Sequence, residues 1–199
     1  DAAAGIVNDP DQVISAEALA GLNEGGGEKN ISTGYHAIEF LLWGQDLSET
    51  GPGDRQYTDY VTDGSGTAEN QDRRGSYLAT VSTLMLENLG ALVDAWATNS
   101  ATENYRDDFL SVEPEESLRR MLTGMILLAG NETGGERLQA ALQTGEQEDE
   151  HSCFSDNTHR EMMQDVQRIL IVWDVLYVRM EGTRVQGVGV EHVLLAEDA

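Results

Sequence analysis

Apolar residues recur at steps of three and four along most of the chain, which is the spacing of an amphipathic helix. The pattern predicts six helical segments, at residues 15–23, 33–44, 72–98, 114–129, 134–143 and 158–180. Alternating apolar and polar runs, which are typical of strands, are nearly absent, and we find no internal repeat. We therefore expect an all-α fold, most simply an antiparallel helical bundle of about four or five helices.

Small polar residues mark the beginnings of two of these helices. Ser32 or Thr33 can cap the second helix, which Gly44 is expected to end. Thr158 and Glu161 stand three positions apart, as the two residues of a capping box do.

Glycines are expected to end the later helices. Gly130 closes the helix that follows Pro114, and Gly182 closes the last long one, leaving one short helix around His192. Residues 44–70 are rich in Gly, Asp, Ser and Thr and predict a long exposed loop. Loops longer than about 12 residues are usually functional or mobile.

The length of 199 residues suits one domain, which we expect to span residues 1–199. Cys153 is the single cysteine, so the chain cannot form an internal disulfide. This leaves the redox compartment open, because proteins without disulfides occur on both sides of a membrane. The chain begins with Asp1 and carries no signal peptide, so we take it for a processed or excised segment.

The charge balance is strongly acidic, with 36 Asp and Glu against 12 Lys and Arg and a net charge of -24. Such a polyanion repels nucleic acid and anionic membrane surfaces, and its natural counterparts are cations. The most apolar segment, residues 169–178, is too short to cross a bilayer and is interrupted by Asp174. We therefore expect no nucleic-acid partner and no transmembrane segment.

His36 and Glu39 are the strongly polar side chains of the apolar run at residues 33–44. A helix that is apolar on every side is expected to be buried, and a buried glutamate needs a compensating partner. Residues at positions i and i+3 share a helix face, so these two side chains can present a nitrogen and an oxygen to one point.

A mixed nitrogen and oxygen set suits iron, zinc or manganese. A divalent metal bound by His36 and Glu39 is therefore one interpretation. The alternative is a buried ion pair, either between these two side chains or between Glu39 and an arginine such as Arg55, Arg73 or Arg119.

Three further ligand candidates lie in an acidic segment that leads into the last long helix: His151, Asp156 and His159. They could complete a coordination shell. Equally, Asp156 could be a plain helix cap and His159 a solvated side chain in the first turn.

Zinc peptidase motifs are absent from the sequence. The pattern His-Glu-x-x-His does not occur, and the inverted form His-x-x-Glu-His fails because position 40 is Phe40. A catalytic zinc normally has three protein ligands, of which only two are local here. The residues thus leave open whether the chain is an enzyme.

Several long motifs resemble the imelysin-like family, also known as insulin-cleaving membrane protease and iron-regulated protein A. The segment from Gly34 to Gly44 carries the Gly-x-His-x-x-Glu signature of that family, and residues 23–33, 51–55 and 150–159 are also similar to it.

This resemblance implies an α-helical bundle, location in the bacterial periplasm or cell envelope, and a link to iron uptake. It implies that His36 and Glu39 belong to the functional site, with a wall formed by Gly34, Trp43, Arg55 and Ser152. The ligand would be a metal ion or an iron chelate, with iron first and zinc second, and the partners would be envelope iron-uptake proteins. Family members usually carry helices before the segment that begins here, so we expect those N-terminal helices to be missing.

Three functions stay open at this point. The first is a metal-binding envelope protein. The second is a metal-dependent peptidase, which the family name suggests and in which Glu39 would be the catalytic residue. The third is a helical module in which the pair is structural and the acidic segment binds a partner protein.

Overall fold

A computed structural model describes residues 5–27 and 30–197. Glu28 and Lys29, which belong to one of the family-like motifs, lie outside the described residues. Helices dominate and the only sheet among the described residues has two strands, so the all-α expectation is confirmed. The chain divides into two compact units: unit 1 comprises Asp1–Ala101 and Phe154–Asp156, and unit 2 comprises Thr102–Cys153 and Asn157–Ala199. That residues 1–199 form a single domain stays a prediction.

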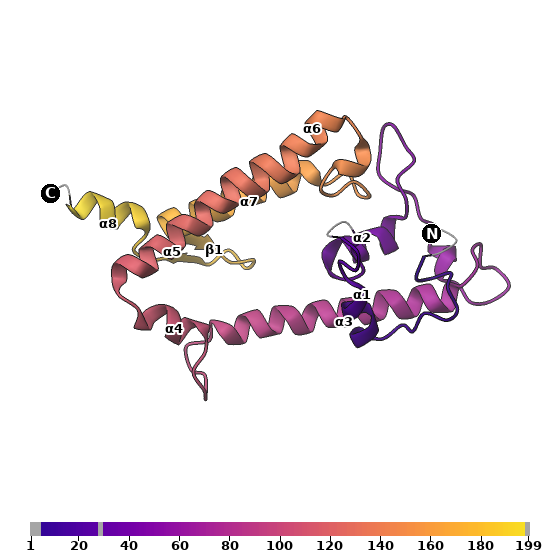
Figure 1. Cartoon of the computed structure of the whole chain (residues 1–199), viewed down its shortest axis with the longest axis horizontal. Coiled ribbons are helices and arrows are strands. Elements are labelled where there is room, and N and C mark those ends of the chain that lie inside the picture. The colour runs from indigo at the N-terminus through magenta and orange to yellow at the C-terminus, as the bar shows by residue number, and fades with distance from the viewer. Residues whose placement is uncertain (1–4, 28–29, 198–199) are drawn as a thin grey trace. The chain divides into compact units, whose positions relative to one another are not determined.

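Unit 1 is built from three α-helices and one 3-10 turn, which are α1 (Ala16–Leu22), α2 (Gly34–Trp43), η1 (Tyr57–Tyr60) and α3 (Gln71–Ala95) (Figure 1). Its buried core consists of Val7, Leu19, Leu41, Tyr77 and Val81. Helix α3 packs against both α1 and α2. The predicted loop at residues 44–70 is confirmed apart from η1.

The caps of α1 and α2 explain where these helices begin and end. The Ser15 hydroxyl accepts a hydrogen bond from the Ala18 amide at 3.2 Å, and Gly44 ends α2 with φ of 76°, a backbone conformation that suits glycine. Of the two expected caps of α2, Thr33 is the N-cap, although its side chain makes no capping bond to any described residue. The Ser32 hydroxyl instead donates to the Leu19 carbonyl at 2.8 Å.

Helix α3 is the one helix among residues 5–27 and 30–197 that is long and apolar enough to cross a membrane, with a mean hydropathy of 1.2 over its most apolar window. This criterion considers only the length and the amino-acid composition of the helix. Helix α3 buries Arg74, Tyr77 and Val81, but only 6% of its most apolar window is buried, so the expectation of no transmembrane segment stays a prediction.

Unit 2 contains four further α-helices before its hairpin and one after it. In chain order its elements are α4 (Tyr105–Ser111), α5 (Pro114–Ile126), the π-helix η2 (Leu127–Gln139), α6 (Ala140–Thr144), η3 (Gln147–Asp149), α7 (Thr158–Asp174), β1 (Leu176–Val178), β2 (Arg184–Gln186) and α8 (Val190–Glu197). Helix α4 was not predicted, although Asn104 and Asp107 form its capping box. The short helix around His192 is confirmed as α8.

Gly130 does not end a helix, contrary to the sequence prediction. Helical structure continues from α5 through η2 into α6, and η2 contains Gly130, Gly134 and Gly135. Glycine lowers the stability of a helix but does not forbid one, and here α5 and α7 both pack against η2. The glycine-rich stretch adopts the wider turns of a π-helix, and the helix is not interrupted there.

The predicted helix at residues 158–180 is too long. It ends at Asp174; Val175 has φ of 48°, and an antiparallel hairpin follows in which Leu176 pairs with Gln186. Gly182 turns this hairpin, since its amide donates to the Arg179 carbonyl at 2.8 Å. Apolar β-branched and aromatic residues at 175–178 fit a strand as well as a helix, so their spacing could not separate the two.

The capping box expected at the start of α7 is also wrong. Asn157 is the N-cap, and the Thr158 hydroxyl accepts a hydrogen bond from the Ser152 amide at 3.0 Å.

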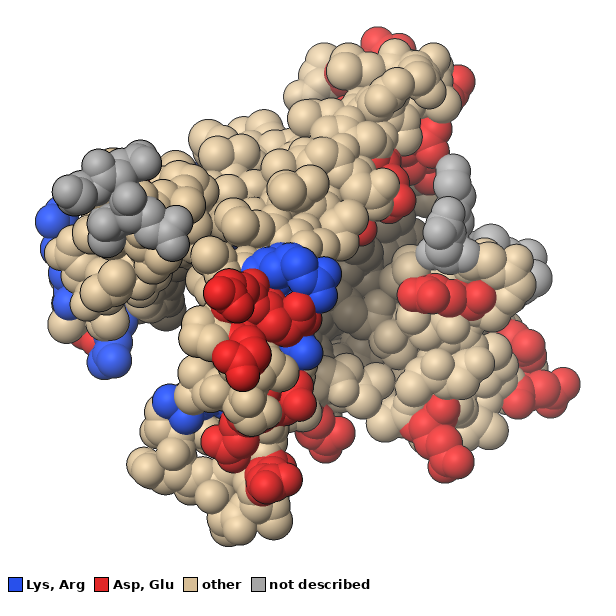
Figure 2. Space-filling model, turned by 60° about the vertical axis from the view of Figure 1, so that its left-hand side comes forward, with Lys and Arg blue, Asp and Glu red and all other residues tan. Residues whose placement is uncertain are grey.

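Acidic side chains, red in Figure 2, outnumber the basic ones on the face shown, in keeping with the net charge of -24.

Candidate functional site

Helix α2 carries the two polar residues of the apolar run. Ala37, Glu39 and Leu41 are buried, whereas Tyr35 is 66% exposed and Leu42 is 46% exposed. The expectation that this helix is buried on every side is therefore wrong. Its buried face nevertheless includes Glu39, so the carboxylate does need compensation.

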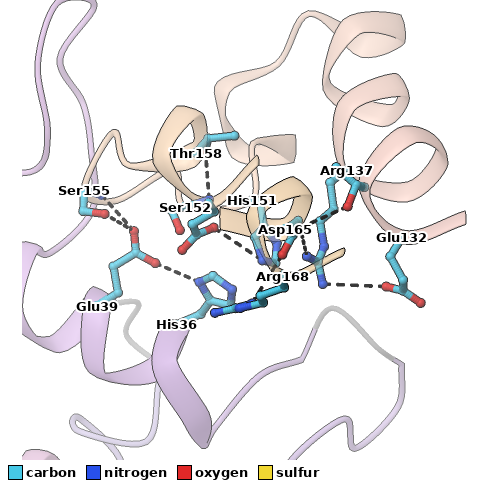
Figure 3. A network of polar contacts seen from close by, with 12 residues as sticks. His36, Glu39, Glu132, Arg137, His151, Ser152, Ser155, Thr158, Asp165 and Arg168 are labelled. Carbon is cyan, nitrogen blue, oxygen red and sulfur yellow. Dashed lines mark hydrogen bonds and ion pairs between the residues drawn. The ribbon is translucent and has the colours of Figure 1, made fainter. Parts of the chain in front are cut away.

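His36 supplies the first partner of Glu39. The His36 Nδ1 atom lies 2.8 Å from Glu39 Oε2, and the side chain of Glu39 is 9% exposed (Figure 3). An ionised carboxylate can only accept hydrogen bonds, so Nδ1 is the donor in this contact. The expected pairing of the two residues across one helical turn is confirmed.

Ser155 supplies the second partner; the sequence analysis singled out its segment, residues 150–159, but not this residue. Its backbone amide donates to Glu39 Oε1 at 2.9 Å, and its hydroxyl donates to the same oxygen at 2.6 Å. Both oxygens of the carboxylate are thus engaged, Oε2 by an imidazole and Oε1 by two donors of one residue. The resemblance had placed Ser152, from the same segment, in the wall of the site.

The segment that carries Ser155 is held to unit 1 by two other contacts. The Gly53 amide donates to the Phe154 carbonyl at 2.9 Å, and the Phe154 ring meets the Phe40 ring edge-on with 5.1 Å between centroids. Aromatic pairs of this geometry add about 0.5–1.5 kcal/mol beyond the area they bury. Ser155 is therefore positioned by its neighbours.

Two opposing effects set the pKa of Glu39. Burial by itself raises that pKa, but the hydrogen bonds from His36 and from the Ser155 hydroxyl and amide outweigh it and hold the pKa below its ordinary value. Glu39 is therefore ionised at neutral pH. Its negative charge is a permanent feature of the site.

The arginines considered as alternative partners of Glu39 have other contacts. Arg55 lies over the Phe40 ring, 5.5 Å from its centroid, and pairs with Asp59 at 3.4 Å. Arg73 donates to four backbone carbonyls near the N-terminus of the unit, those of Ile6, Val7, Asp9 and Gln12. Arg119 belongs to unit 2 and pairs with Glu116 at 2.5 Å.

Two of the predicted wall residues line a cavity in unit 1. Trp43 and Arg55 border a hollow of about 490 Å³ that also touches Gly44 and Gly53. Gly34 begins α2 with φ of 86°. Ser152 is buried in unit 2, where its amide bonds to Thr158.

The other ligand candidates are distributed over both units. His151 lies in unit 2 with Nε2 3.4 Å from Glu161 Oε2, and His159 is exposed in the first turn of α7, as the solvated alternative predicted. Asp156 belongs to the segment of unit 1 that carries Ser155 and has φ of 53°. It is not the cap of α7, because Asn157 holds that position.

The described residues do not assemble a complete metal shell. No group of three or more His, Cys, Asp or Glu side chains within residues 5–27 and 30–197 is placed to hold a metal ion. His36 Nδ1 and Glu39 Oε2 lie 2.8 Å apart, close enough for both to lie about 2 Å from one ion once the ion displaces the Nδ1 proton that they share in the metal-free chain. Two protein ligands are too few for a structural site in which the protein supplies every ligand. They are enough for an ion whose other ligands are water or a small chelator.

The model of the imelysin family, classed as peptidase family M75, matches residues 1–199. A comparison with curated proteins found no match.

Proposed function

Because the chain belongs to the imelysin family, we propose that it is a periplasmic or cell-envelope protein that binds a divalent metal ion at His36 and Glu39. The contact between His36 Nδ1 and Glu39 Oε2 carries this proposal, since it brings an imidazole nitrogen and an ionised carboxylate oxygen to one point. Iron is the first candidate and zinc the second, because both accept mixed nitrogen and oxygen ligands.

The metal would arrive with ligands of its own. His36 and Glu39 supply two donors, and ions of this kind need four to six, so water or a small chelator must supply the remainder. An iron chelate meets this requirement. Asp156 belongs to unit 1 together with His36 and Glu39 and is a candidate for a contact to such a chelate, whereas His151 and His159 belong to unit 2 and are left out of the proposed site.

Binding is better supported than hydrolysis. A general base works best with a pKa near the operating pH, whereas the contacts of Glu39 move its pKa down and make the carboxylate a weaker base. A catalytic zinc also needs about three protein ligands. The site favours cargo binding, and delivery of iron to envelope uptake proteins is the role we propose for it.

Calorimetric titration of the metal-stripped chain with Fe²⁺ under anaerobic conditions, and with Zn²⁺, tests the proposal. We expect saturable binding that His36→Ala weakens at least tenfold, since it deletes one of two protein donors. His192→Ala is the matched control, because His192 lies in α8 of unit 2, where its Nδ1 accepts a hydrogen bond from the Gly189 amide.

A protease assay separates the competing functions. Cleavage of unfolded casein that is abolished by a chelator and by Glu39→Gln would replace the binding proposal with the peptidase one. If His36→Ala leaves the metal affinity unchanged, the contact between His36 and Glu39 has only a structural role.

A further inference from the structure

The two oxygens of the Glu39 carboxylate differ in how much of their hydrogen-bonding capacity is used. Each oxygen of an ionised carboxylate has about two lone-pair positions. Oε1 accepts two hydrogen bonds from Ser155, one from the amide at 2.9 Å and one from the hydroxyl at 2.6 Å (Figure 3). Both lone-pair positions of Oε1 are therefore occupied by donors of one residue.

Oε2 is the oxygen that faces the imidazole. It shares a proton with His36 Nδ1 at 2.8 Å, and an ion that displaces this proton gains a nitrogen and an oxygen ligand together. An ion that also took Oε1 would have to break at least one bond from Ser155. The carboxylate therefore presents two unequal oxygens to a metal.

The backbone around Ser155 is held in place independently of Glu39. The Gly53 amide donates to the Phe154 carbonyl at 2.9 Å, and the Phe154 ring packs edge-on against the Phe40 ring. The Ser155 amide cannot turn away from Oε1 unless these contacts move. The Glu39 side chain is 9% exposed, so water has little access to replace a bond that is broken there.

We propose that Ser155 is a positioning residue of the metal site, which makes Glu39 a ligand through Oε2 alone. The inference rests on the proposed metal function and adds a basis for selectivity to it. Ca²⁺ takes six to eight oxygen ligands and often both oxygens of one carboxylate, whereas Zn²⁺ and Fe²⁺ accept a nitrogen and a single oxygen. Ser155 thus disfavours Ca²⁺ by keeping Oε1 occupied.

The test is calorimetric titration of the metal-stripped full chain with Zn²⁺ and, separately, with Ca²⁺. Ser155→Ala should weaken Zn²⁺ binding about tenfold, the lower end of the usual effect of a residue that orients a metal ligand. It should leave Ca²⁺ binding unchanged or make it tighter, because Oε1 regains a lone-pair position. The ratio of the two affinities separates the roles, since a merely structural serine would change both alike.

Two further variants calibrate this ratio. Ser155→Thr keeps a hydroxyl at the same position and should restore the ratio of the parent chain. Ser76→Ala removes a hydroxyl at an exposed position of α3 and should leave the ratio unchanged.

Infrared difference spectra of the parent chain, with and without Zn²⁺, need no variant at Ser155 to fold. Ligation through one oxygen separates the asymmetric and symmetric carboxylate stretching bands more widely than ligation through both oxygens. We expect the wide separation, in a pair of bands that Glu39→Gln removes. The narrow separation in those bands would overturn the positioning role.

The titrations also distinguish the failure of this inference from the failure of the metal site. If His36→Ala weakens Zn²⁺ binding but Ser155→Ala leaves the ratio of Zn²⁺ to Ca²⁺ affinity unchanged, the positioning role is wrong and the metal site stands. If the parent chain binds no Zn²⁺, both are wrong.

Discussion

Ser155 donates two hydrogen bonds to a single oxygen of Glu39, from its amide at 2.9 Å and from its hydroxyl at 2.6 Å. The two residues are 116 positions apart in the chain. Because His36 occupies the other oxygen, the charge of the carboxylate is compensated from two sides. Glu39 thus ties residues 154–156 to α2.

Removing the Ser155 hydroxyl should raise the pKa of Glu39. Ser155→Ala deletes the bond at 2.6 Å and keeps the amide bond, so one of the contacts that lower this pKa is lost. We also expect the free energy of unfolding to fall by about 1 kcal/mol, the usual worth of one such bond. Carbon-13 NMR titration of the glutamate carboxyl groups in the metal-free chain measures the shift. Ser76→Ala, at an exposed position of α3, should leave it unchanged.

The stabilising effect of Glu39 should disappear in acid. A carboxylate whose pKa is lower in the folded chain than in the unfolded chain stabilises the fold above the unfolded pKa, and this contribution is lost as pH falls through the folded value. The ordinary value is 4.5 and the folded value is lower, so the loss occurs below pH 4.5.

Glu39→Gln should therefore lower the free energy of unfolding at pH 7 by about 1–3 kcal/mol. The difference from the parent chain should shrink below pH 4.5, where both side chains become neutral. Denaturant unfolding at pH 7 and pH 3 compares the two, with exposed Glu87→Gln as control. A difference that is independent of pH would contradict an ionised Glu39.

The glycines around Pro52 should differ in their tolerance of a methyl group. A Cβ atom at Gly53 would lie 2.6 Å from the Trp43 carbonyl oxygen, whereas a Cβ at Gly51 meets no heavy atom within 4 Å. We expect Gly53→Ala to cost about 1–3 kcal/mol, as overpacking does, and Gly51→Ala to cost less than about 0.5 kcal/mol. Thermal unfolding of both variants checks this, and equal effects would refute the close approach at Gly53.

The two arginines that contact the Asp165 carboxylate in unit 2 should contribute unequally to the free energy of unfolding. Buried Asp165 accepts a hydrogen bond from the Thr133 hydroxyl at 3.0 Å. It also accepts from Arg137 at 2.9 Å, while Arg168 lies 3.4 Å away with 69% of its side chain exposed (Figure 3). Arg137→Met should cost about 3 kcal/mol, because it leaves a buried charge short of its partner, and Arg168→Met less than about 1 kcal/mol. Urea unfolding distinguishes them, and a larger effect at Arg168 would contradict this ranking.

The sequence predicts local features well because they depend on neighbouring residues. The stop at Gly44 follows from the glycine itself, and the partnership of His36 with Glu39 follows from a spacing of one helical turn. The need of a buried carboxylate for donors is equally local.

Features that depend on distant packing were not predictable. Ser155 reaches Glu39 only because the contacts of Phe154 with Phe40 and Gly53 bring its segment to unit 1. The start of the hairpin at Leu176 and the passage of helical structure through Gly130 were missed for a related reason. In both places one residue pattern suits two structures, and contacts with other elements decide between them.

The most direct test of metal binding at His36 and Glu39 is an anomalous difference map from crystals of the full chain loaded with iron. We predict one peak within about 2.5 Å of a His36 ring nitrogen and a Glu39 carboxylate oxygen, the distance of first-row metal ligands. The peak should vanish in the His36→Ala, Glu39→Ala double variant. A peak elsewhere in the chain that persists in the double variant would contradict the proposed site.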